Sequence, residues 1–196
     1  MTSNLNCDDQ TMSELMAVME QDTKAGIQQA SKILVNYPDD ARVHFLQGSL
    51  LIETGDLIGA HNALKRAVEI APDFAIARFQ LGFFQLTSGE SNEALKTWAR
   101  LDMLPDDHYL SLFVVGLRHL IRDEIADSIR CLEEGISVNQ EILPLNNDMR
   151  LLVQEIRPLL KADGEEGGTD AQELDEAEEV SATSFILNQF KDQKRH

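Results

Sequence analysis

The feature that most constrains the fold is a 34-residue sequence pattern that occurs twice between residues 41 and 107. Each copy has a small residue inside an apolar segment, then a Gly-Asp or Gly-Glu turn, then an alanine inside a second apolar segment. The matched positions are Gly48 and Gly82, Gly55 and Gly89, Ala60 and Ala94, and Leu64 and Trp98. Because a helix–turn–helix unit of this size cannot bury its apolar face alone, the period predicts units that stack on their neighbours.

The order of small residue, glycine turn and alanine, closed by Pro72, resembles the tetratricopeptide repeat (TPR) family. The resemblance implies an all-α fold, a TPR-like helical solenoid of about four helix–turn–helix repeats with a C-terminal capping helix and an acidic disordered tail. It also implies that the first helix of each repeat lines a concave groove that receives a peptide or helix of a partner protein.

The repeat boundaries are set by residues that stay in phase with the two clear copies. Pro38 precedes Pro72 by 34 residues, Gly116 follows Gly82 by 34, and Asp123 stands where a turn glycine is expected. The predicted organisation is a flexible N-terminus (1–10), repeats over about 11–38, 41–74, 75–107 and 108–140, a capping helix (145–160), an acidic disordered linker (161–184) and a short apolar and basic tail motif (185–196).

The repeated glycines predict two different structural roles. Gly48 and Gly82 fall in mid-helix, where glycine costs about 1 kcal/mol relative to alanine. We therefore expect the partner helix of each pair to approach closely there. Gly55 and Gly89 precede the turns, and we expect them to adopt the positive φ that ends a helix.

The charge balance disfavours several classes of partner. The net charge is −17, whereas nucleic-acid binding requires a basic surface that displaces counterions. The first twenty residues lack a signal-peptide pattern, and no apolar run has the length of a bilayer crossing. Two cysteines, Cys7 and Cys131, fit a reducing compartment. We expect a cytoplasmic protein with no nucleic-acid partner and no membrane insertion.

No catalytic, cofactor-binding or metal site is predicted. The five histidines are scattered and form no helical pair at metal-ligand spacing. The glycines are not followed by the lysine and hydroxyl residues of a phosphate-binding loop. Acidic pairs such as Asp39-Asp40 are typical of helix caps and solvated faces. We expect a protein without enzymatic activity.

The TPR resemblance assigns the candidate groove to the first helix of each repeat, at positions flanking the small residue. These positions are Arg42, Phe45, Ser49 and Ile52 in the second repeat, Ile76, Phe79, Phe83 and Leu86 in the third, and Tyr109, Leu112, Leu117 and Leu120 in the fourth. An alternative is that the aromatic residues pack between repeats as core. The basic clamp of chaperone-binding TPR domains is missing, which argues against an Hsp90 or Hsp70 adaptor. Because this face holds too many apolar residues for all of them to be core, we favour an apolar groove.

Three functions fit this prediction. The first is a scaffold or adaptor that holds a partner peptide or helix in the apolar groove. The second is a small TPR chaperone that shields an apolar client segment, like those of bacterial type III secretion. The third is a regulatory subunit recruited through its C-terminal tail. The sequence leaves the partner and the oligomeric state open.

The tail carries a short apolar motif beyond an acidic spacer. The spacer holds nine acidic residues and no basic one between residues 162 and 180, a composition typical of disorder. The motif consists of Phe185, Ile186, Leu187 and Phe190. We expect it to dock either in the groove of its own chain or on another protein, the alternative being a solubilising tail with an incidental apolar patch.

Overall fold

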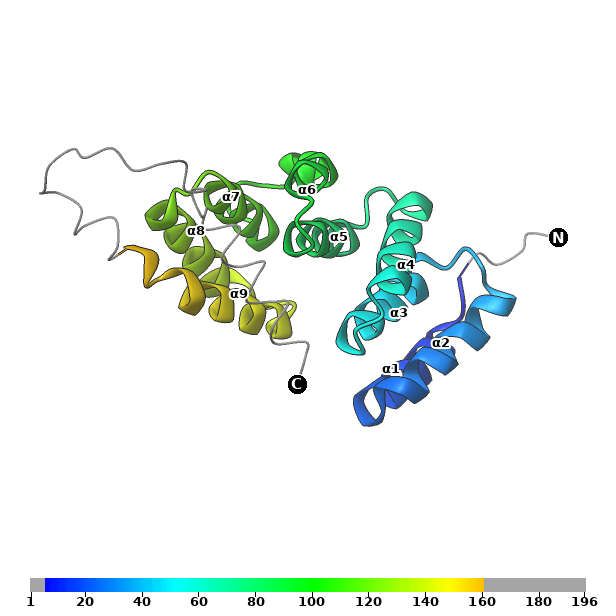
Figure 1. The fold of residues 1–196 in the computed structure, drawn as a ribbon. Helices are drawn as coiled ribbons and strands as arrows, with labels where there is room; N and C mark the ends of the chain where they lie inside the picture. The colour runs from blue at the N-terminus through cyan, green and yellow to red at the C-terminus, as the bar shows by residue number, and fades with distance from the viewer. Residues whose placement is uncertain (1–5, 161–196) are drawn as a thin grey trace, which may run out of the picture. The chain divides into compact units, whose positions relative to one another are not determined.

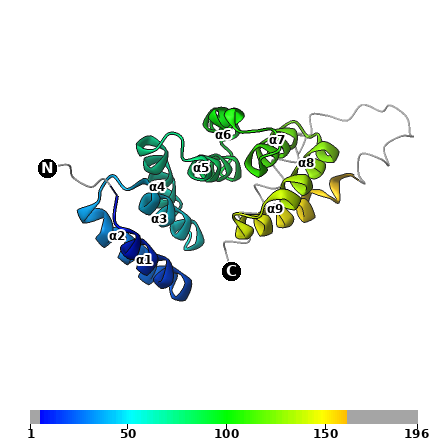
Figure 2. The same ribbon diagram turned by 180° about the vertical axis from the view of Figure 1, so that it is seen from behind.

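The computed structural model describes residues 6–160, and this part of the chain is all-α, as predicted, with no strand (Figures 1 and 2). The elements are α1 (Asp9–Gln21), α2 (Thr23–Asn36), α3 (Ala41–Glu53), α4 (Leu57–Ile70), α5 (Ala75–Thr87), α6 (Ser91–Trp98), the 3₁₀ helix η1 (Ala99–Met103), α7 (Tyr109–Ile121), α8 (Ile125–Val138) and α9 (Leu143–Ile156). The linker predicted over 161–184 and the tail motif over 185–196 lie outside the described residues, as do residues 1–5.

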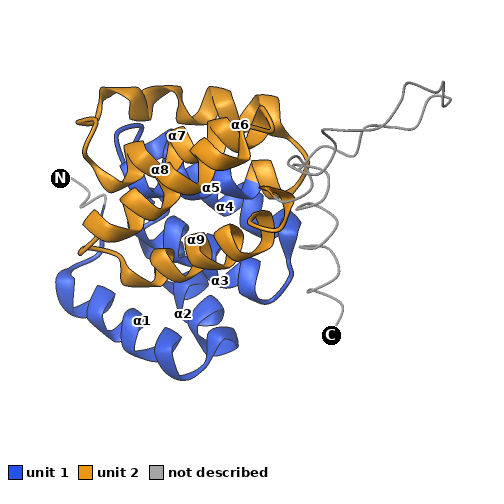
Figure 3. Cartoon of the chain, turned by 90° about the vertical axis from the view of Figure 1, so that its left-hand side faces the viewer, with its two compact units in different colours: residues 1–84 blue, residues 85–196 orange. Residues whose placement is uncertain are grey.

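The chain divides into two compact units, Met1–Phe84 and Gln85–His196 (Figure 3). The boundary falls inside α5, so the two ends of that helix belong to different units. In the first unit, α1 packs on α2, α2 on α3 and α3 on α4. In the second unit, α7 packs on α8 and α8 on α9. Neighbouring helices therefore fold back on each other as hairpins within each unit (Figures 1 and 2).

The period of the sequence is also the period of the helices. The helices α3, α5, α7 and α9 begin at Ala41, Ala75, Tyr109 and Leu143, each one full period after the one before. The predicted capping helix thus starts at the same phase as a first helix of a repeat, slightly earlier than the sequence suggested. Pro144 lies in its first turn, where the missing N–H has no helical partner to lose.

The second helix expected for the third repeat changes character partway. The third repeat (75–107) predicts a single second helix, but α6 ends at Trp98 and the chain continues as the 3₁₀ helix η1. Tighter 3₁₀ winding is frequent where an α-helix ends. Both Trp98 and Leu101 are buried, so this segment still faces the core of its unit.

The turns inside three successive helix pairs share one backbone conformation. Gly55, Gly89 and Asp123 have φ values of 79°, 87° and 59°. In each turn the following N–H donates back to the carbonyl five residues earlier, as from Asp56 to Leu51 at 3.0 Å. This left-handed closure at the end of a helix favours glycine, and Asp123 adopts it without one.

Two in-phase glycines sit where a second helix comes close. A Cβ on Gly48 would lie 2.8 Å from Cγ of Leu64, and one on Gly116 would lie 2.9 Å from Cγ of Leu132. Both distances are shorter than side-chain carbons tolerate, so a larger residue at either position requires the opposing leucine or its helix to shift. The mid-helix glycines therefore have the packing role predicted for Gly48.

Cys7 is tied to the region of α3, although the sequence predicted a flexible N-terminus over residues 1–10. Cys7 is 4% exposed and belongs to a core cluster with Leu15 and Val43. Its backbone N–H donates to Oδ2 of the fully buried Asp40 at 2.8 Å. Asp8 caps α1 by accepting from the N–H of Thr11. The described part of this segment is thus folded from Cys7 onward.

Candidate interaction surface

Four of the predicted groove residues lie along one side of α3. Arg42, Phe45, Ser49 and Ile52 are spaced by three or four residues, which places them on one helical face. All four are partly exposed. We call these four residues the α3 strip. They are the predicted positions that the structure leaves most uniformly accessible.

Phe45 and Ile52 have both an exposed and a packed side. They lie against a cluster of Ala60, Leu64, Leu81 and Phe84 in the first unit. Phe45 also meets the ring of Phe74 edge-on, with centroids 5.4 Å apart. The cluster fixes where these two side chains stand, so their exposed sides form a preorganised apolar surface.

Ser49 lies between them with its hydroxyl turned to its own helix. The hydroxyl donates to the carbonyl of Phe45 at 3.1 Å, a bond to the preceding turn. No other described group is needed to satisfy that donor. Serine therefore places a small, partly exposed side chain between the two apolar residues.

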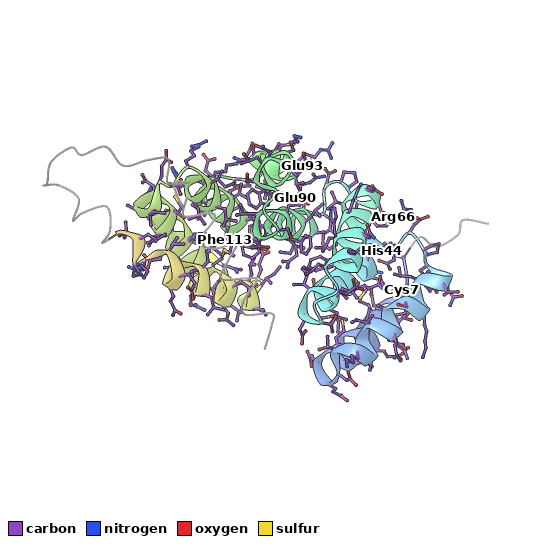
Figure 4. The ribbon with its side chains drawn as sticks, in the orientation of Figure 1. Cys7, His44, Arg66, Glu90, Glu93 and Phe113 are labelled. Atoms are coloured by element: carbon purple, nitrogen blue, oxygen red, sulfur yellow. The ribbon has the colours of Figure 1, made fainter. Side chains whose placement is uncertain are left out.

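Arg42, at the start of the α3 strip, is committed to the N-terminal anchor. Its Nη2 donates to Asp40 Oδ2 at 2.8 Å and to the carbonyl of Cys7 at 2.7 Å. Burial alone raises the pKa of Asp40, but hydrogen bonds from Arg42 and Cys7 outweigh it and lower that pKa to about 2. Arg42 thus holds a buried carboxylate in its charged form as well as lining the surface. Cys7, whose carbonyl accepts a hydrogen bond from Arg42, is labelled in Figure 4.

The candidates on α5 are mostly enclosed. Phe79 is fully buried, and Phe83 and Leu86 are 9% and 4% exposed. The rings of Phe79 and Phe83 lie nearly parallel with centroids 6.1 Å apart. Only Ile76 is partly exposed. These aromatic side chains contribute to the core. This agrees with the alternative interpretation of the sequence, in which the aromatic residues pack as core and do not line a groove.

The candidates on α7 belong to the second unit and are also largely enclosed. Tyr109, Leu117 and Leu120 are buried, whereas Leu112 is partly exposed. Burial and the nearby Glu141 raise the pKa of Tyr109 to about 12. The structure therefore does not leave these residues on one open surface of α7.

Phe113 is the residue in α7 that sequence reasoning missed. It follows Phe79 by 34 residues, yet we had chosen Leu112 at that phase. The structure buries Phe113 fully and packs it edge-on against Tyr109, with ring centroids 6.0 Å apart. Strict counting of the sequence period would have found it.

The titratable groups do not assemble into a reactive centre in the described residues. Burial raises the pKa of Cys7 to about 11 and raises the pKa of Cys131 as well. A nucleophilic cysteine requires a lowered pKa. Two of the histidines serve local structure: His44 Nε2 donates to the Pro38 carbonyl at 2.9 Å, and His108 Nδ1 accepts from the N–H of Leu110 at 3.1 Å.

The same range, residues 6–160, holds neither a metal-binding cluster nor a membrane-spanning helix. No group of three or more His, Cys, Asp or Glu side chains there is arranged to hold a metal ion. No helix there combines the length and apolar character that a bilayer crossing requires. Compared with models of known protein families and with curated proteins, the chain shows no match.

Proposed function

We propose that the chain is a TPR-type helical solenoid that works as a non-enzymatic protein-interaction module, a scaffold or adaptor that binds a peptide or helix of a partner protein. The solenoid interpretation is supported by the phase of the helices, because a first helix begins once per sequence period from Ala41 to Leu143. It is also supported by the repeated close contact of Gly48 with Leu64 and of Gly116 with Leu132.

The observation that carries the binding proposal is the α3 strip. α3 packs against α2 and α4, yet this face keeps four side chains partly exposed along the helix. Phe45 and Ile52 offer apolar area, and the side chain of Ser49 between them is small and partly exposed. Grooves of this kind receive amphipathic helices or extended segments through apolar anchors at alternating turns.

The partner that fits is a segment with two apolar side chains spaced to contact Phe45 and Ile52. Helical residues seven apart lie on one face and span about 10 Å, since each residue rises about 1.5 Å. A partner helix with apolar residues at such spacing matches the strip. Each anchor removed from water contributes roughly 1.5–3 kcal/mol.

The test is a matched pair of substitutions in the full chain. Ser49→Arg places a long charged side chain in the middle of the α3 strip and breaks no described hydrogen bond outside its own helix. Asn62→Arg places the same side chain on the exposed face of α4 and serves as the control. Circular dichroism checks that both variants keep the helical content of the parent.

Partners are captured on the parent protein and quantified by mass spectrometry, then compared between the two variants. We expect Ser49→Arg to lower the yield of the specific partner by at least about tenfold, since a central interface residue is commonly worth more than about 1.4 kcal/mol. Asn62→Arg should leave the yield unchanged. Equal capture by Ser49→Arg and the parent would contradict binding at the α3 strip.

A further inference from the structure

The helix α9 has the phase of a first helix but no second helix after it in the described residues. It begins at Leu143, one full sequence period after the start of α7 at Tyr109. In α7, Phe113 and Gly116 face α8: a Cβ on Gly135 would lie 2.6 Å from the Phe113 ring, and one on Gly116 would lie 2.9 Å from Leu132. The residues of α9 at these phases therefore mark the side on which a second helix would pack.

That side of α9 is exposed. Asn147 and Arg150 occupy the phases of Phe113 and Gly116, and both are exposed. Two large apolar side chains flank them on the same face, Leu143 at 58% and Leu151 at 54% exposure. We define the open face of α9 as Leu143, Asn147, Arg150, Leu151 and Gln154.

The opposite side of the helix carries its packing. Leu145, Met149, Leu152 and Ile156 are buried, and α9 packs on α8. A buried amide pair fixes the approach, because Asn139 Nδ2 donates to Asn146 Oδ1 at 2.8 Å. The open face is thus left over after α9 has met its neighbour, and its two leucines have no described apolar partner that buries them.

The sequence that follows does not provide a second helix in phase. By the sequence period that helix would span about residues 159–172, but this stretch contains ADGEEGG and lacks an apolar face. The next apolar segment is the tail motif, Phe185 to Phe190. Its residues Ile186, Leu187 and Phe190 are spaced by one, three and four positions, which places them together on one side of a helix.

Length and charge both match this segment to the open face. About 24 residues separate Leu160 from Phe185, and a flexible chain of that length spans roughly 25–30 Å. The helix α9 has 14 residues, or about 21 Å of length, so every part of it is within reach. Arg150 lies in the middle of the open face and binds only the amide oxygen of Asn147, at 3.0 Å, among the described residues. The acidic spacer offers it the missing carboxylates.

We propose that residues 184–190 of the same chain pack against the open face of α9, in the place that a second helix occupies in the α3–α4 and α7–α8 pairs, with the acidic spacer alongside Arg150. The packing covers Leu143 and Leu151 and completes the end of the helical array. It needs no other protein and is independent of the function proposed for the α3 strip. Tethering gives the motif an effective concentration of up to about a millimolar, so a weak contact suffices.

Hydrogen–deuterium exchange of the purified full chain tests the proposal, followed by mass spectrometry of peptides covering residues 184–190. At a millimolar effective concentration, a contact with a dissociation constant of about 0.1 mM slows exchange roughly tenfold. We expect that protection in the parent and its loss in Leu151→Glu. Ile58→Glu, at an equally apolar residue on α4 that is 79% exposed, should keep it.

The reciprocal substitution Ile186→Glu should give the same loss, and it changes no residue of the described helices. Protection that persists in Leu151→Glu, or a parent tail that exchanges at the rate of a free peptide, overturns the proposal. Release of the tail by Ser49→Arg instead would place the motif on the α3 strip and also overturn it. So would protection that disappears on dilution, because the contact would then join two copies of the chain.

Discussion

The α3–α4 pair of the first unit and the α7–α8 pair of the second are two repeats apart and share their closest contact. A Cβ on Gly48 would lie 2.8 Å from Cγ of Leu64, and one on Gly116 would lie 2.9 Å from Cγ of Leu132. At this contact the two pairs use the same residue types, because any Cβ would collide with the opposing leucine. Close helix approach therefore fixes residue identity.

The same two pairs differ at their turns and caps. Gly55 and Asp123 both have positive φ, although only glycine adopts it without a steric cost. Asp40 and His108 both cap the first helix of their pair, one with a buried carboxylate and the other with a ring nitrogen. A turn therefore requires a particular backbone conformation, and a cap requires a hydrogen-bond acceptor. More than one residue type can meet either requirement.

The largest difference in unfolding free energy is expected at the two helix caps, because Asp40 is buried and makes more hydrogen bonds than His108. Asp40→Ala removes the acceptor of Cys7 and Arg42 from a fully buried position, so we expect a loss of about 3 kcal/mol in unfolding free energy. His108→Ala removes one ordinary cap bond and should cost about 1 kcal/mol. Urea unfolding of both variants measures the difference, and equal losses would contradict a special role for the Asp40 anchor.

The next effect is expected at the shared contact. Gly48→Val and Gly116→Val force side-chain atoms into space held by Leu64 and Leu132, so each should lose about 2–3 kcal/mol. Ala126→Val, on the exposed side of α8, introduces valine into a helix without a collision. It should cost less than about 1 kcal/mol. Denaturant midpoints of the three variants show whether the loss of stability comes from the position of the valine or from valine itself.

Acid should weaken the first unit through Asp40. Its pKa in the folded chain is about 2, below the ordinary value of 3.8, so its charged form stabilises the fold at higher pH. That contribution, about 2 kcal/mol, is present above pH 4 and is lost as the pH falls towards 2. Unfolding free energy measured from pH 5 to 2 should fall less steeply for Asp40→Asn than for the parent; parallel curves would contradict the assignment.

The smallest effect is expected at the turn. Asp123→Gly removes the steric cost of a positive φ and should raise the unfolding free energy by about 0.5–1 kcal/mol. Gly55→Ala introduces that cost at the equivalent turn and should lower the free energy by about 1 kcal/mol. Opposite signs in the two variants, read from thermal unfolding, would show that the turns share one conformation.

The sequence was sufficient for features that depend on a local pattern. The helical character, the phase of Gly48 and the turn at Gly55 follow from residue types that recur at a fixed spacing. Asp123 was placed at a turn only because its neighbours define the period. Positive φ at that residue follows from tertiary structure, because aspartate alone gives no such signal.

The sequence was insufficient where burial depends on distant residues. Asp40 was assigned as a helix cap, but its bond to Cys7 joins residues 33 apart and has no sequence pattern. A phenylalanine can serve either as an exposed partner-binding residue or as a core residue. Only the packing in the structure shows that Phe79 and Phe83 are buried. The α3 strip was anticipated as part of a longer groove, whereas most other members of that groove are buried.

The most direct test of the repeated packing is a pair of double-mutant cycles, Gly48→Ala with Leu64→Ala and Gly116→Ala with Leu132→Ala. In the parent, each alanine at a glycine position should lower the unfolding free energy, because its Cβ meets the opposing leucine. In the leucine-truncated background the same change should cost less, because the side-chain contact is gone and only the backbone contacts remain, at 3.2 Å to N of residue 64 and 3.1 Å to O of Ser128. We predict coupling energies of the same sign in both cycles, about 0.5–3 kcal/mol each. Additive effects in either cycle would contradict the claim that the sequence period builds the same helix pair twice.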